Sequence, residues 1–389
     1  MPSVASWRAM TFFRSILCLL LLAVAFPCFG ADTARIDALL ADAISHNLVA
    51  GGVVLIGSRD KVLFERAYGR VSGAPEARAL TADTLFDLAS LTKVVATTPS
   101  VLKLAEEGRL SLLDPVVKWF PEFAGRGKDA ILVLNLLTHT SGLDDIPLSS
   151  ANPIGSAIEG AAAQKLKGEV GSRFKYADLN FILLAELIRR ATGAGLDLYT
   201  QASFYRPLAM ADTSFNPRDK GRCSPTLCED RLYTGEVQDT LSRQMGGVAG
   251  HAGLFSTAQD LARFCRMMLG GGILDGRRVL AQRTVDQMTA PYFSRGGDVV
   301  RGLGWDIASP YSSPRGLGFS KVSFGHTGYS GSSIWIDPVA DTFVILLTAR
   351  LDYKNVHEFS KFRGELSTLA SLLFGVPQPL REMALFNDE

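Results

Sequence analysis

Two kinds of hydrophobic pattern alternate along the chain. Short apolar runs separated by turn-forming residues occur near both ends: residues 50–69 predict one β-hairpin with its turn at residues 57–61, and residues 332–350 predict a second with its turn at residues 337–340. Between the hairpins, apolar residues recur at helical spacing, and several of these stretches end at glycine, as helix C-termini often do. The stretches that predict helices are residues 33–47, 93–108, 180–193, 257–272 and 355–375.

This order puts strands at both ends of the chain and helices in the middle. We therefore predict an α/β (α+β) fold for residues 31–389: one antiparallel sheet built from both chain ends, flanked by helices, with a mainly helical lobe inserted. The sheet-containing lobe would take in residues 31–85 and 290–389, and the helical lobe residues 86–289. No internal period is visible, which argues against a repeat architecture.

Residues 1–30 have the pattern of a secretory signal peptide. Arg8 and Arg14 precede a short apolar run, residues 16–26, and small residues follow it. A membrane-spanning helix needs about 20 apolar residues, which is more than this run provides. We therefore predict cleavage after Gly30 and export to the periplasm or the medium.

Composition and charge narrow the possible partners. The chain has 389 residues, 47% of them hydrophobic, which is enough for a substantial buried core. Its 40 Lys and Arg residues nearly cancel its 39 Asp and Glu residues, and no basic stripe stands out. The sequence therefore lacks the cluster of basic residues that would indicate nucleic-acid binding.

Three cysteines remain after the predicted signal peptide. Cys223 and Cys228 lie in a polar loop, and an exported protein can join them in a disulfide, which we predict. Cys265 lies in a strongly apolar helical pattern, where it is expected to pack as a small core residue. Without a histidine cluster nearby, these cysteines predict no metal site.

Three serines each precede a lysine by three positions, so the predicted structure around each pair must show which one is a candidate for catalysis. The pairs are Ser58/Lys61, Ser90/Lys93 and Ser172/Lys175. Only Ser90 and Lys93 stand where a helix is predicted to begin, so that their side chains share one helical face. There the positive potential of the helix start favours an alkoxide-like transition state, and a desolvated lysine with a lowered pKa could take the serine proton. The alternative is a helix start without chemistry.

Two later stretches add candidate chemistry. FKYADLN, residues 174–180, has Tyr176 just before a predicted buried helix. FGHTGYSGSSIWI, residues 324–336, has a glycine-rich turn at a strand edge, where backbone N–H groups can bind an oxyanion. In chain order and spacing the three motifs resemble the Ser-x-x-Lys, Tyr-x-Asn and Lys-Thr-Gly motifs of the penicillin-recognising serine hydrolases. These include class C β-lactamases, low-molecular-weight D-alanyl-D-alanine peptidases and related esterases.

The resemblance covers nearly all of the mature chain and implies a role for each matching residue. Ser90 would be the nucleophile, at the junction of the sheet and the helical lobe, and Lys93 its base partner. Tyr176 would carry the proton between the nucleophile and the leaving group. The backbone N–H groups of Ser90 and Tyr329 would form the oxyanion hole. The other residues that the motifs assign to the substrate are Asp178, His326, Thr327 and Gly328.

Two residues depart from the motifs of that family. Asp178 stands where the second motif often has Asn, so an amide that could donate to a substrate carbonyl becomes a carboxylate, which only accepts. His326 replaces the lysine of the third motif, which in β-lactamases and D-alanyl peptidases faces the substrate carboxylate. An unperturbed imidazole is mostly neutral above its pKa of about 6.5. Both changes favour general hydrolysis over β-lactam specialisation.

The function that these motifs imply is that of an exported serine hydrolase. It would form an acyl-enzyme on Ser90, need no cofactor and no metal, and cleave an amide or ester bond in a D-alanyl peptide, an ester or a β-lactam. Its partner would be a small-molecule or cell-wall-peptide substrate; the oligomeric state is open. The alternative is a catalytically inactive binding protein of the same fold that holds peptidoglycan fragments.

Five further residues carry weaker expectations. His139 is expected to be a hydrogen-bonded structural residue, and Trp305 a core residue. His251 lies in a glycine-rich loop that can line a pocket, and Asp239 is a candidate for orienting that loop. Pro99 cannot donate to the carbonyl of the residue four positions earlier, so we expect a kink there that leaves the first turn of the helix unaffected.

Overall fold

The structure is a computed structural model, and it describes residues 33–228, 231–293, 299–351 and 353–375. The predicted signal peptide, with Cys18 and Cys28, lies outside the described residues. The chain divides into two units at Ala34, and the elements named below belong to the second unit, Arg35–Glu389, apart from the first residue of α2. Among the described residues, no helix has the length and apolar composition needed to cross a membrane.

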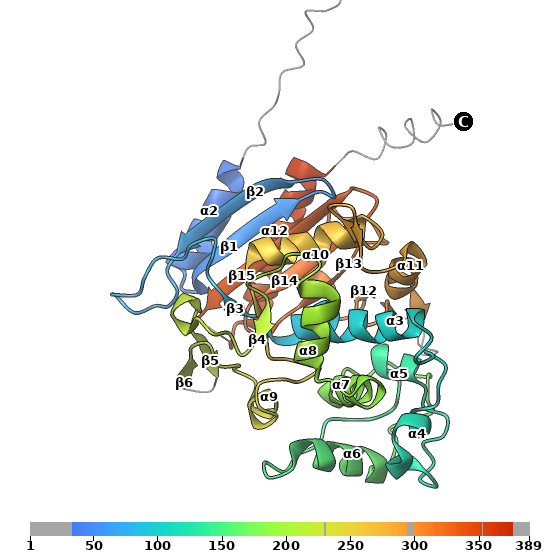
Figure 1. Ribbon diagram of the computed structural model, residues 1–389. Coiled ribbons are helices and arrows are strands. Elements are labelled where there is room, and N and C mark those ends of the chain that lie inside the picture. The colour runs from blue at the N-terminus through green and yellow to red at the C-terminus, as the bar shows by residue number, and fades with distance from the viewer. Residues whose placement is uncertain (1–32, 229–230, 294–298, 352, 376–389) are drawn as a thin grey trace, which may run out of the picture. The chain divides into compact units, whose positions relative to one another are not determined.

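An antiparallel sheet of eight strands forms the framework (Figure 1). Its order is β10-β11-β12-β13-β14-β15-β1-β2, and every neighbouring pair is antiparallel. The strands are β1 (Val49–Gly57), β2 (Val62–Gly69), β10 (Tyr292–Phe293), β11 (Val300–Arg301), β12 (Asp306–Ala308), β13 (Phe324–Thr327), β14 (Ser333–Asp337) and β15 (Thr342–Arg350). Because β1 lies between β15 and the edge strand β2, strands from the two ends of the chain pair with each other inside the sheet. This confirms the predicted sheet built from both chain ends.

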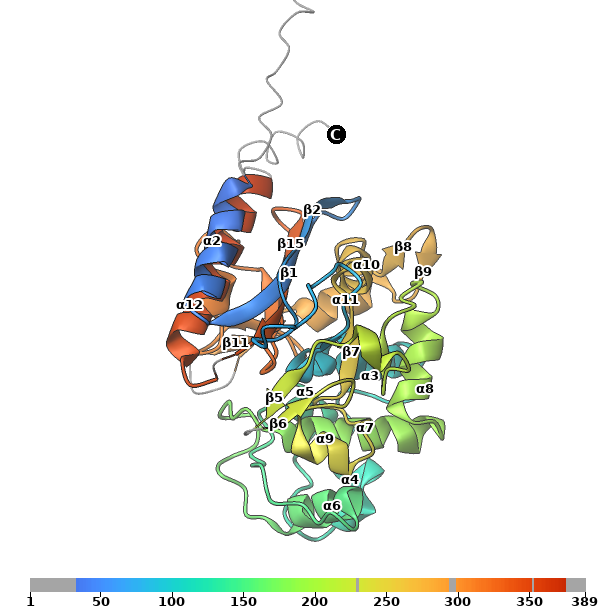
Figure 2. The same cartoon turned by 90° about the vertical axis from the view of Figure 1, so that its left-hand side faces the viewer.

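Helices cover both faces of this sheet, so its central strands are buried on both sides. Helices α2 (Ala34–Ser45) and α12 (Val356–Phe374) lie side by side on one face (Figure 2). Helix α10 (Ala258–Leu269) packs on the other face, against β1 and β15. Along β1, Val54 and Ile56 join the core under α2 and α12, whereas Val53 and Leu55 join the larger core on the opposite side. This alternation explains why the strand reads as a continuous apolar run.

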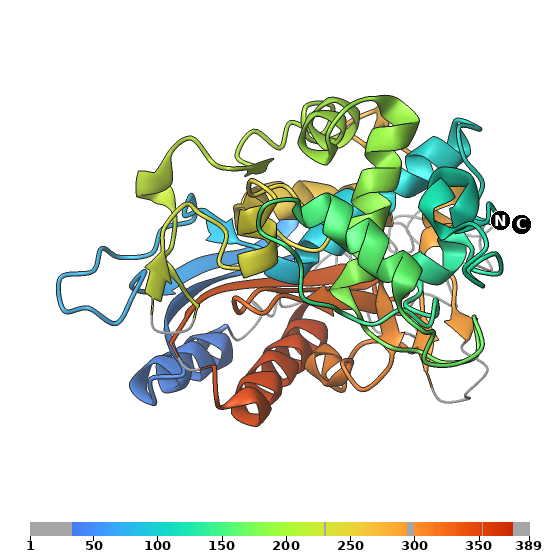
Figure 3. The ribbon, with the colours of Figure 1, turned by 90° about the horizontal axis from the view of Figure 1, so that it is seen from below.

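The remaining helices gather on the side of the sheet opposite α2 and α12 (Figure 3). They are α3 (Thr98–Glu106), α4 (Val116–Trp119), α5 (Val133–Leu137), α6 (Pro153–Ala163), α7 (Asp178–Thr192), α8 (Leu196–Thr200), α9 (Thr240–Gln244) and α11 (Gln282–Thr289). Three small sheets link them: β3 (Phe86–Asp87) with β7 (Leu254–Ser256) and β4 (Ser214–Phe215), β5 (Thr226–Cys228) with β6 (Arg231–Tyr233), and β8 (Ile273–Leu274) with β9 (Arg277–Arg278). Trp305 is fully buried in the main core, as predicted.

The helix expected from Ser90 onward is less regular than its sequence predicts. A 3₁₀ turn, Ala89–Leu91, leads into a π-helical turn, Lys93–Thr97, and α-helical geometry begins only with α3. Pro99 has no N–H for the Val95 carbonyl, and that carbonyl instead accepts a hydrogen bond from the buried Tyr205 hydroxyl at 3.4 Å. The prediction of an undisturbed first turn was therefore wrong, since the wider π-helical turn begins at Lys93 itself.

The predicted disulfide is absent, and Cys223 and Cys228 are both free thiols. Cys223 is buried beside Leu85 and Phe255, whereas Cys228 ends strand β5 and is only partly buried. Their close spacing in sequence carries no information on the directions of the two side chains, and a disulfide requires those directions to converge. Cys265 is fully buried on α10, as predicted.

Gly328 allows the end of β13 to approach the turn that carries Ser90. A Cβ at this position would clash with the Oγ of Ser332 and with the carbonyl oxygen of Leu88. These two groups are hydrogen-bonded to each other at 3.0 Å, so neither is free to move away. The end of β13 and the turn that carries Ser90 are therefore in direct contact at this glycine.

We predict that Gly328→Ala destabilises the protein by about 1–3 kcal/mol, because the added methyl group has no space. Urea unfolding would measure the change in free energy of unfolding. Gly168→Ala is the matched control, since its Cβ would meet only the Oγ of Ser172, at 3.7 Å. Equal unfolding midpoints for both variants would contradict the close approach at Gly328.

Candidate active site

Ser90 follows a strained residue that a buried carboxylate holds in place. Ala89 has φ of 47°, in the left-handed region that residues with a side chain rarely adopt. Its N–H donates to Oδ1 of Asp87 at 2.8 Å, and Oδ2 of Asp87 accepts from the N–H of Gln238 at 2.8 Å. Burial raises the pKa of Asp87 to about 6. Asp87 is a positioning residue that sequence reasoning missed, because nothing in its local pattern marks it.

Lys93 is fully buried and its ammonium group touches three partners. Its Nζ lies 3.2 Å from Oγ of Ser90, 3.0 Å from the carbonyl oxygen of His251 and 2.7 Å from Oδ1 of Asp178. Asp178 is the first residue of α7, where the helix dipole favours a negative charge. The structure thus brings together the serine and lysine of the first motif with the aspartate of the second.

The charges of this buried pair differ from the sequence-based expectation. Burial alone would lower the pKa of Lys93, but the attraction of Asp178 and of Tyr176 outweighs it, and the pKa is raised. Burial likewise would raise the pKa of Asp178, and the charge of Lys93 lowers it instead. Lys93 is therefore an ammonium and Asp178 a carboxylate at neutral pH. The predicted lowering of the lysine pKa was wrong, because it left out the counter-ion.

The ring of Tyr176 contacts both the ammonium group of Lys93 and the ring of His139. The Tyr176 ring stacks on the His139 ring with centroids 4.4 Å apart, and Nζ of Lys93 lies 5.1 Å from the tyrosine ring centroid. The tyrosine hydroxyl interacts with the side chains of Lys93 and Ser90, and burial raises its pKa. His139 accepts from the N–H of Ala177 through Nδ1 at 3.3 Å, which confirms its predicted structural, hydrogen-bonded role.

Two cavities meet at Ser90. The first, of about 280 Å³, is called the arginine cavity, and the second, of about 390 Å³, the aspartate cavity. The arginine cavity is lined by Ser90, Tyr176, Arg301, Asp306, Tyr311, His326, Thr327, Gly328, Tyr329, Arg350, Val356 and Arg363. The aspartate cavity is lined by Ala89, Ser90, Tyr176, Asp178, Cys228, Gln238, Asp239, Thr240, Leu241, His251, Ala252 and Tyr329. Every residue that the three motifs single out lines one of these cavities, except Lys93, which lies beneath them.

The side chain of His326 lines the arginine cavity and is uncharged at neutral pH. It is 6% exposed, and its Nδ1 lies 2.8 Å from the carbonyl oxygen of Thr327, so Nδ1 carries the proton. Burial, together with the charges of Arg301 and Lys93, lowers its pKa well below 6.5. The sequence-based expectation of an imidazole with an ordinary pKa was therefore wrong.

Arg301 and Arg363 bring positive charge into the same cavity, and sequence reasoning missed both. Nη1 of Arg301 pairs with Oδ1 of Asp306 at 3.2 Å, and its guanidinium lies 5.0 Å from the ring centroid of Phe174. Nη2 of Arg363 donates to the carbonyl oxygen of Gly328 at 2.7 Å. Burial lowers the pKa of Arg363 to about 9, which still leaves it charged at neutral pH.

The loop that carries His251 fixes the other side of Lys93. Nε2 of His251 pairs with Oδ1 of Asp239 at 2.9 Å, and the Thr97 hydroxyl donates to the carbonyl oxygen of Gly250 at 2.7 Å. Burial opposes ionisation of Asp239, but its hydrogen bond and attraction to His251 lower its pKa to about 2. The pair holds the loop so that the His251 carbonyl faces Lys93.

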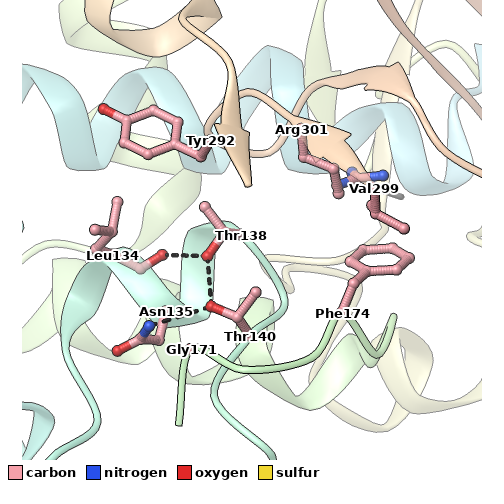
Figure 4. A pocket seen from close by; sticks show the side chains of 9 residues that line it. All are labelled: Leu134, Asn135, Thr138, Thr140, Gly171, Phe174, Tyr292, Val299 and Arg301. Atoms are coloured by element: carbon pink, nitrogen blue, oxygen red, sulfur yellow. Dashed lines mark hydrogen bonds between the residues drawn. The ribbon is translucent and has the colours of Figure 1, made fainter. Parts of the chain in front are cut away.

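A third, smaller cavity lies beside the site (Figure 4). It measures about 100 Å³, and Arg301 borders both it and the arginine cavity. The Thr138 hydroxyl donates to the Leu134 carbonyl at 2.9 Å and lies 2.8 Å from Oγ1 of Thr140, to which Asn135 donates at 3.1 Å. These hydroxyls satisfy one another. In the described part of the chain, no three His, Cys, Asp or Glu side chains gather as a metal-ligand set.

Two Salmonella proteins are similar in sequence to this chain over about two thirds of its length. A D-alanyl-D-alanine carboxypeptidase of Salmonella agona (strain SL483), provisionally named as such, is 31% identical over 306 residues, which cover 69% of this chain and 70% of the relative. The corresponding protein of Salmonella typhi, with the same provisional name, has the same identity and coverage.

Solved structures share the fold at lower identity. A penicillin-binding protein homologue from Caulobacter crescentus superposes with a TM-score of 0.73 at 22% identity, covering 87% of this chain and 96% of the other. EstCE1, described as a hydrolase with promiscuous acyltransferase activity, superposes with a TM-score of 0.71 at 19% identity, covering 86% and 98%.

The family model described as "Beta-lactamase" matches residues 36–362, which span both the sheet and the helical region. That range includes all three motifs with Ser90, Lys93, Tyr176 and His326 in their expected order. The chain therefore belongs to the β-lactamase family.

Proposed function

We propose that this protein is a serine hydrolase that acylates Ser90 and acts on D-alanyl peptides whose leaving group ends in a free carboxylate. The observation that carries the proposal is the contact of Ser90 Oγ with Nζ of Lys93 at 3.2 Å, at the point where the arginine and aspartate cavities meet. A serine beside a lysine and a tyrosine, open to a substrate-sized cavity, is the arrangement that nucleophilic acyl transfer requires.

The reaction would proceed in two halves. In the first half, Oγ of Ser90 forms a bond to the carbonyl carbon of the substrate, and the carbonyl oxygen becomes an oxyanion. The hydroxyl proton of Ser90 passes to the group formed by Lys93, Tyr176 and Asp178. The backbone N–H groups of Ser90 and Tyr329 are the proposed donors to that oxyanion. The bond to the leaving nitrogen then breaks as Tyr176 supplies a proton, and water releases the acyl group by the reverse transfers.

The arginine cavity supports a carboxylate on the leaving group. Its lining includes three arginines and one carboxylate: Arg301, Arg350, Arg363 and Asp306. An opposite charge about 4 Å away contributes about 4 kcal/mol at an effective dielectric of 20. These guanidiniums supply the positive charge that His326 lacks, and the name of the Salmonella relatives agrees with such a substrate.

The setting that we propose is outside the cytoplasm. The support is the pattern of residues 1–30, with its basic start and short apolar run. D-alanyl peptides with a free carboxylate belong to cell-wall material, which an exported enzyme would meet.

We predict that a fluorophosphonate probe labels Ser90 covalently and that Ser90→Ala abolishes both labelling and hydrolysis without loss of fold. Ser172→Ala is the matched control, because Ser172 also precedes a lysine by three positions but donates to the Glu169 carbonyl at 2.5 Å. Mass spectrometry of the labelled peptide identifies the residue. Labelling that persists in Ser90→Ala would refute the proposed nucleophile, and an unlabelled, inactive native protein would favour the inactive binding protein.

We predict that Arg301→Gln lowers the preference for a free carboxylate about tenfold or more, because it removes a buried positive charge. The measurement is the ratio of kcat/KM for a D-alanyl-D-alanine peptide to that for its C-terminal amide. Arg301→Lys, which keeps the charge, should retain most of the ratio. A ratio unchanged by both substitutions, in variants with native circular dichroism, would mean that the carboxylate binds elsewhere.

We predict that the same ratio stays constant as the pH falls from about 8 through 6.5, because burial and the charges of Arg301 and Lys93 hold the pKa of His326 well below 6.5. His326→Gln should leave its pH dependence flat as well. A preference for the free acid that rises about tenfold as the pH falls through 6.5, and disappears in His326→Gln, would show instead that the imidazole gains charge beside the substrate.

A further inference from the structure

Within the group that Lys93 forms with Tyr176 and Asp178, the aspartate is the residue with no individual role in the proposed reaction. It occupies the position where the second motif of related hydrolases has Asn, yet its carboxylate contacts Nζ of Lys93 at 2.7 Å. Among the described ion pairs, Lys93 occurs in this one alone. The Asp178 side chain is 30% exposed, whereas Lys93 is fully enclosed, so the aspartate is the solvent-facing member of the pair.

The pair creates a difficulty for the transfer of the serine proton. Lys93 already carries its full set of protons as an ammonium ion, so it cannot accept another one from Ser90. A proton must leave Nζ before or while the serine proton arrives. The nearest described base in contact with Nζ is the carboxylate of Asp178.

We propose that Asp178 is the terminal proton acceptor of the acylation step and acts through Lys93, a role that rests on the proposed hydrolase function. As the bond from Oγ of Ser90 to the carbonyl carbon forms, the Ser90 proton moves to Nζ and a proton of Nζ moves to Oδ1 of Asp178. The electron pair of the carbonyl moves to its oxygen. The total charge of the site and substrate is unchanged, because the carboxylate of Asp178 loses its negative charge as the oxyanion gains one.

The second half of the step restores the pair. As the tetrahedral intermediate collapses, the carbonyl re-forms and the bond to the leaving group breaks. The leaving group takes the hydroxyl proton of Tyr176, Tyr176 takes one from Lys93, and Lys93 recovers its proton from Asp178. No oxidant, metal or further reactant is needed, and the same relay can run again with water as the nucleophile.

The other charged groups around Lys93 have partners of their own. Those that interact electrostatically with Lys93 or Asp178 are Tyr176, His251, Asp239, Asp145, His139 and His326. Asp239 pairs with His251, and Oδ1 of Asp145 accepts from the N–H of Leu179 at 2.9 Å. The nearby carboxylates are thus engaged elsewhere, and Asp178 is the one in contact with Nζ.

The relay predicts a distinctive pH profile. Between the lowered pKa of Asp178 and the raised pKa of Lys93 the pair keeps one protonation state, so its titration should leave the rate of Ser90 labelling by a fluorophosphonate unchanged from about pH 5 to about pH 9. Asp87, which fixes the turn before Ser90, has a pKa of about 6, and any step that it causes there is shared by the native protein and the variants. A flat profile here means one with no other step. In Asp178→Asn, burial acts on Lys93 without a counter-ion and its pKa falls. Lys93 must then lose its proton to solvent, and the rate should rise with pH.

The experiment compares labelling rates of the full chain and three variants across that pH range. We expect Asp178→Asn to be about a hundredfold slower than the native protein near pH 5 but within about tenfold near pH 9. Asp178→Glu should restore the flat profile, because it keeps a carboxylate. Asp145→Asn, which removes a neighbouring carboxylate that does not touch Lys93, should also stay flat.

Three results would overturn the relay. One is a flat profile in Asp178→Asn, parallel to that of the native protein. Another is a sloping profile in Asp145→Asn equal to that of Asp178→Asn, which would mean a general charge effect. If Asp178→Asn fails to fold, the native protein decides alone, since a native profile that rises with a midpoint between about pH 7 and pH 9, above the titration of Asp87, excludes the proposed acceptor. Failure of the hydrolase proposal looks different, because Ser90 would then not be labelled at any pH.

Discussion

The burial of one ammonium group constrains the site more than any other interaction. Lys93 has no exposure to solvent, and a charge in such a place is tolerated only when it is paired and hydrogen-bonded. Its partners come from three separate parts of the chain: Ser90 in the preceding turn, Asp178 at the start of α7 and the carbonyl of His251 in the loop before β7. Loss of the counter-ion would leave a buried charge uncompensated, at a cost of about 3–5 kcal/mol. The arrangement of these three segments is therefore coupled to the charge of one side chain.

The sheet supplies the other fixed side of the site. Because β1 pairs with β15, and β15 with β14, the position of β13 in the sheet is fixed relative to the N-terminal strand β1. After β13 the chain turns against the segment that precedes Ser90. The Ser330 hydroxyl donates to the Asp87 carbonyl at 2.6 Å, and the Ser332 hydroxyl donates to the Leu88 carbonyl at 3.0 Å. These bonds join the rigid sheet to the nucleophile's turn, so the helical side and the sheet side meet at Ser90.

The local pattern of hydrophobic residues was sufficient to predict the main strands and several of the helices. The alternation of hydrophobic residues predicted the two hairpins and the antiparallel sheet from both chain ends, and helix periodicity predicted α2, α7, α10 and α12. The same local reasoning was wrong about the turn at Lys93, since the carbonyl of Val95 is satisfied by Tyr205, far along the chain. It was wrong about the cysteines because spacing does not set side-chain direction.

Electrostatic properties could not be predicted from local pattern, because they depend on which distant residues become neighbours. The raised pKa of Lys93 needs Asp178 from another helix, and the lowered pKa of His326 needs burial together with Arg301. Arg301 and Arg363 enter one cavity only because β11 and α12 lie near β13 in the folded chain. In the sequence, each of these residues looks like an ordinary strand or helix position.

The placement of charge around Ser90 explains how a neutral His326 is compatible with an anionic substrate. The Lys93–Asp178 pair, in contact with Ser90, is neutral as a whole, so in the proposed reaction it would move protons without favouring either sign of substrate charge. The positive charge lies instead in the arginine cavity, on Arg301 and Arg363, while the third-motif position stays neutral. A lysine at position 326 would add a third cation near Arg301 and Lys93, in a place where burial and those two charges already suppress protonation of an imidazole. The proposed function thus places proton transfer and carboxylate binding on different groups, the Lys93–Asp178 pair and the arginine cavity.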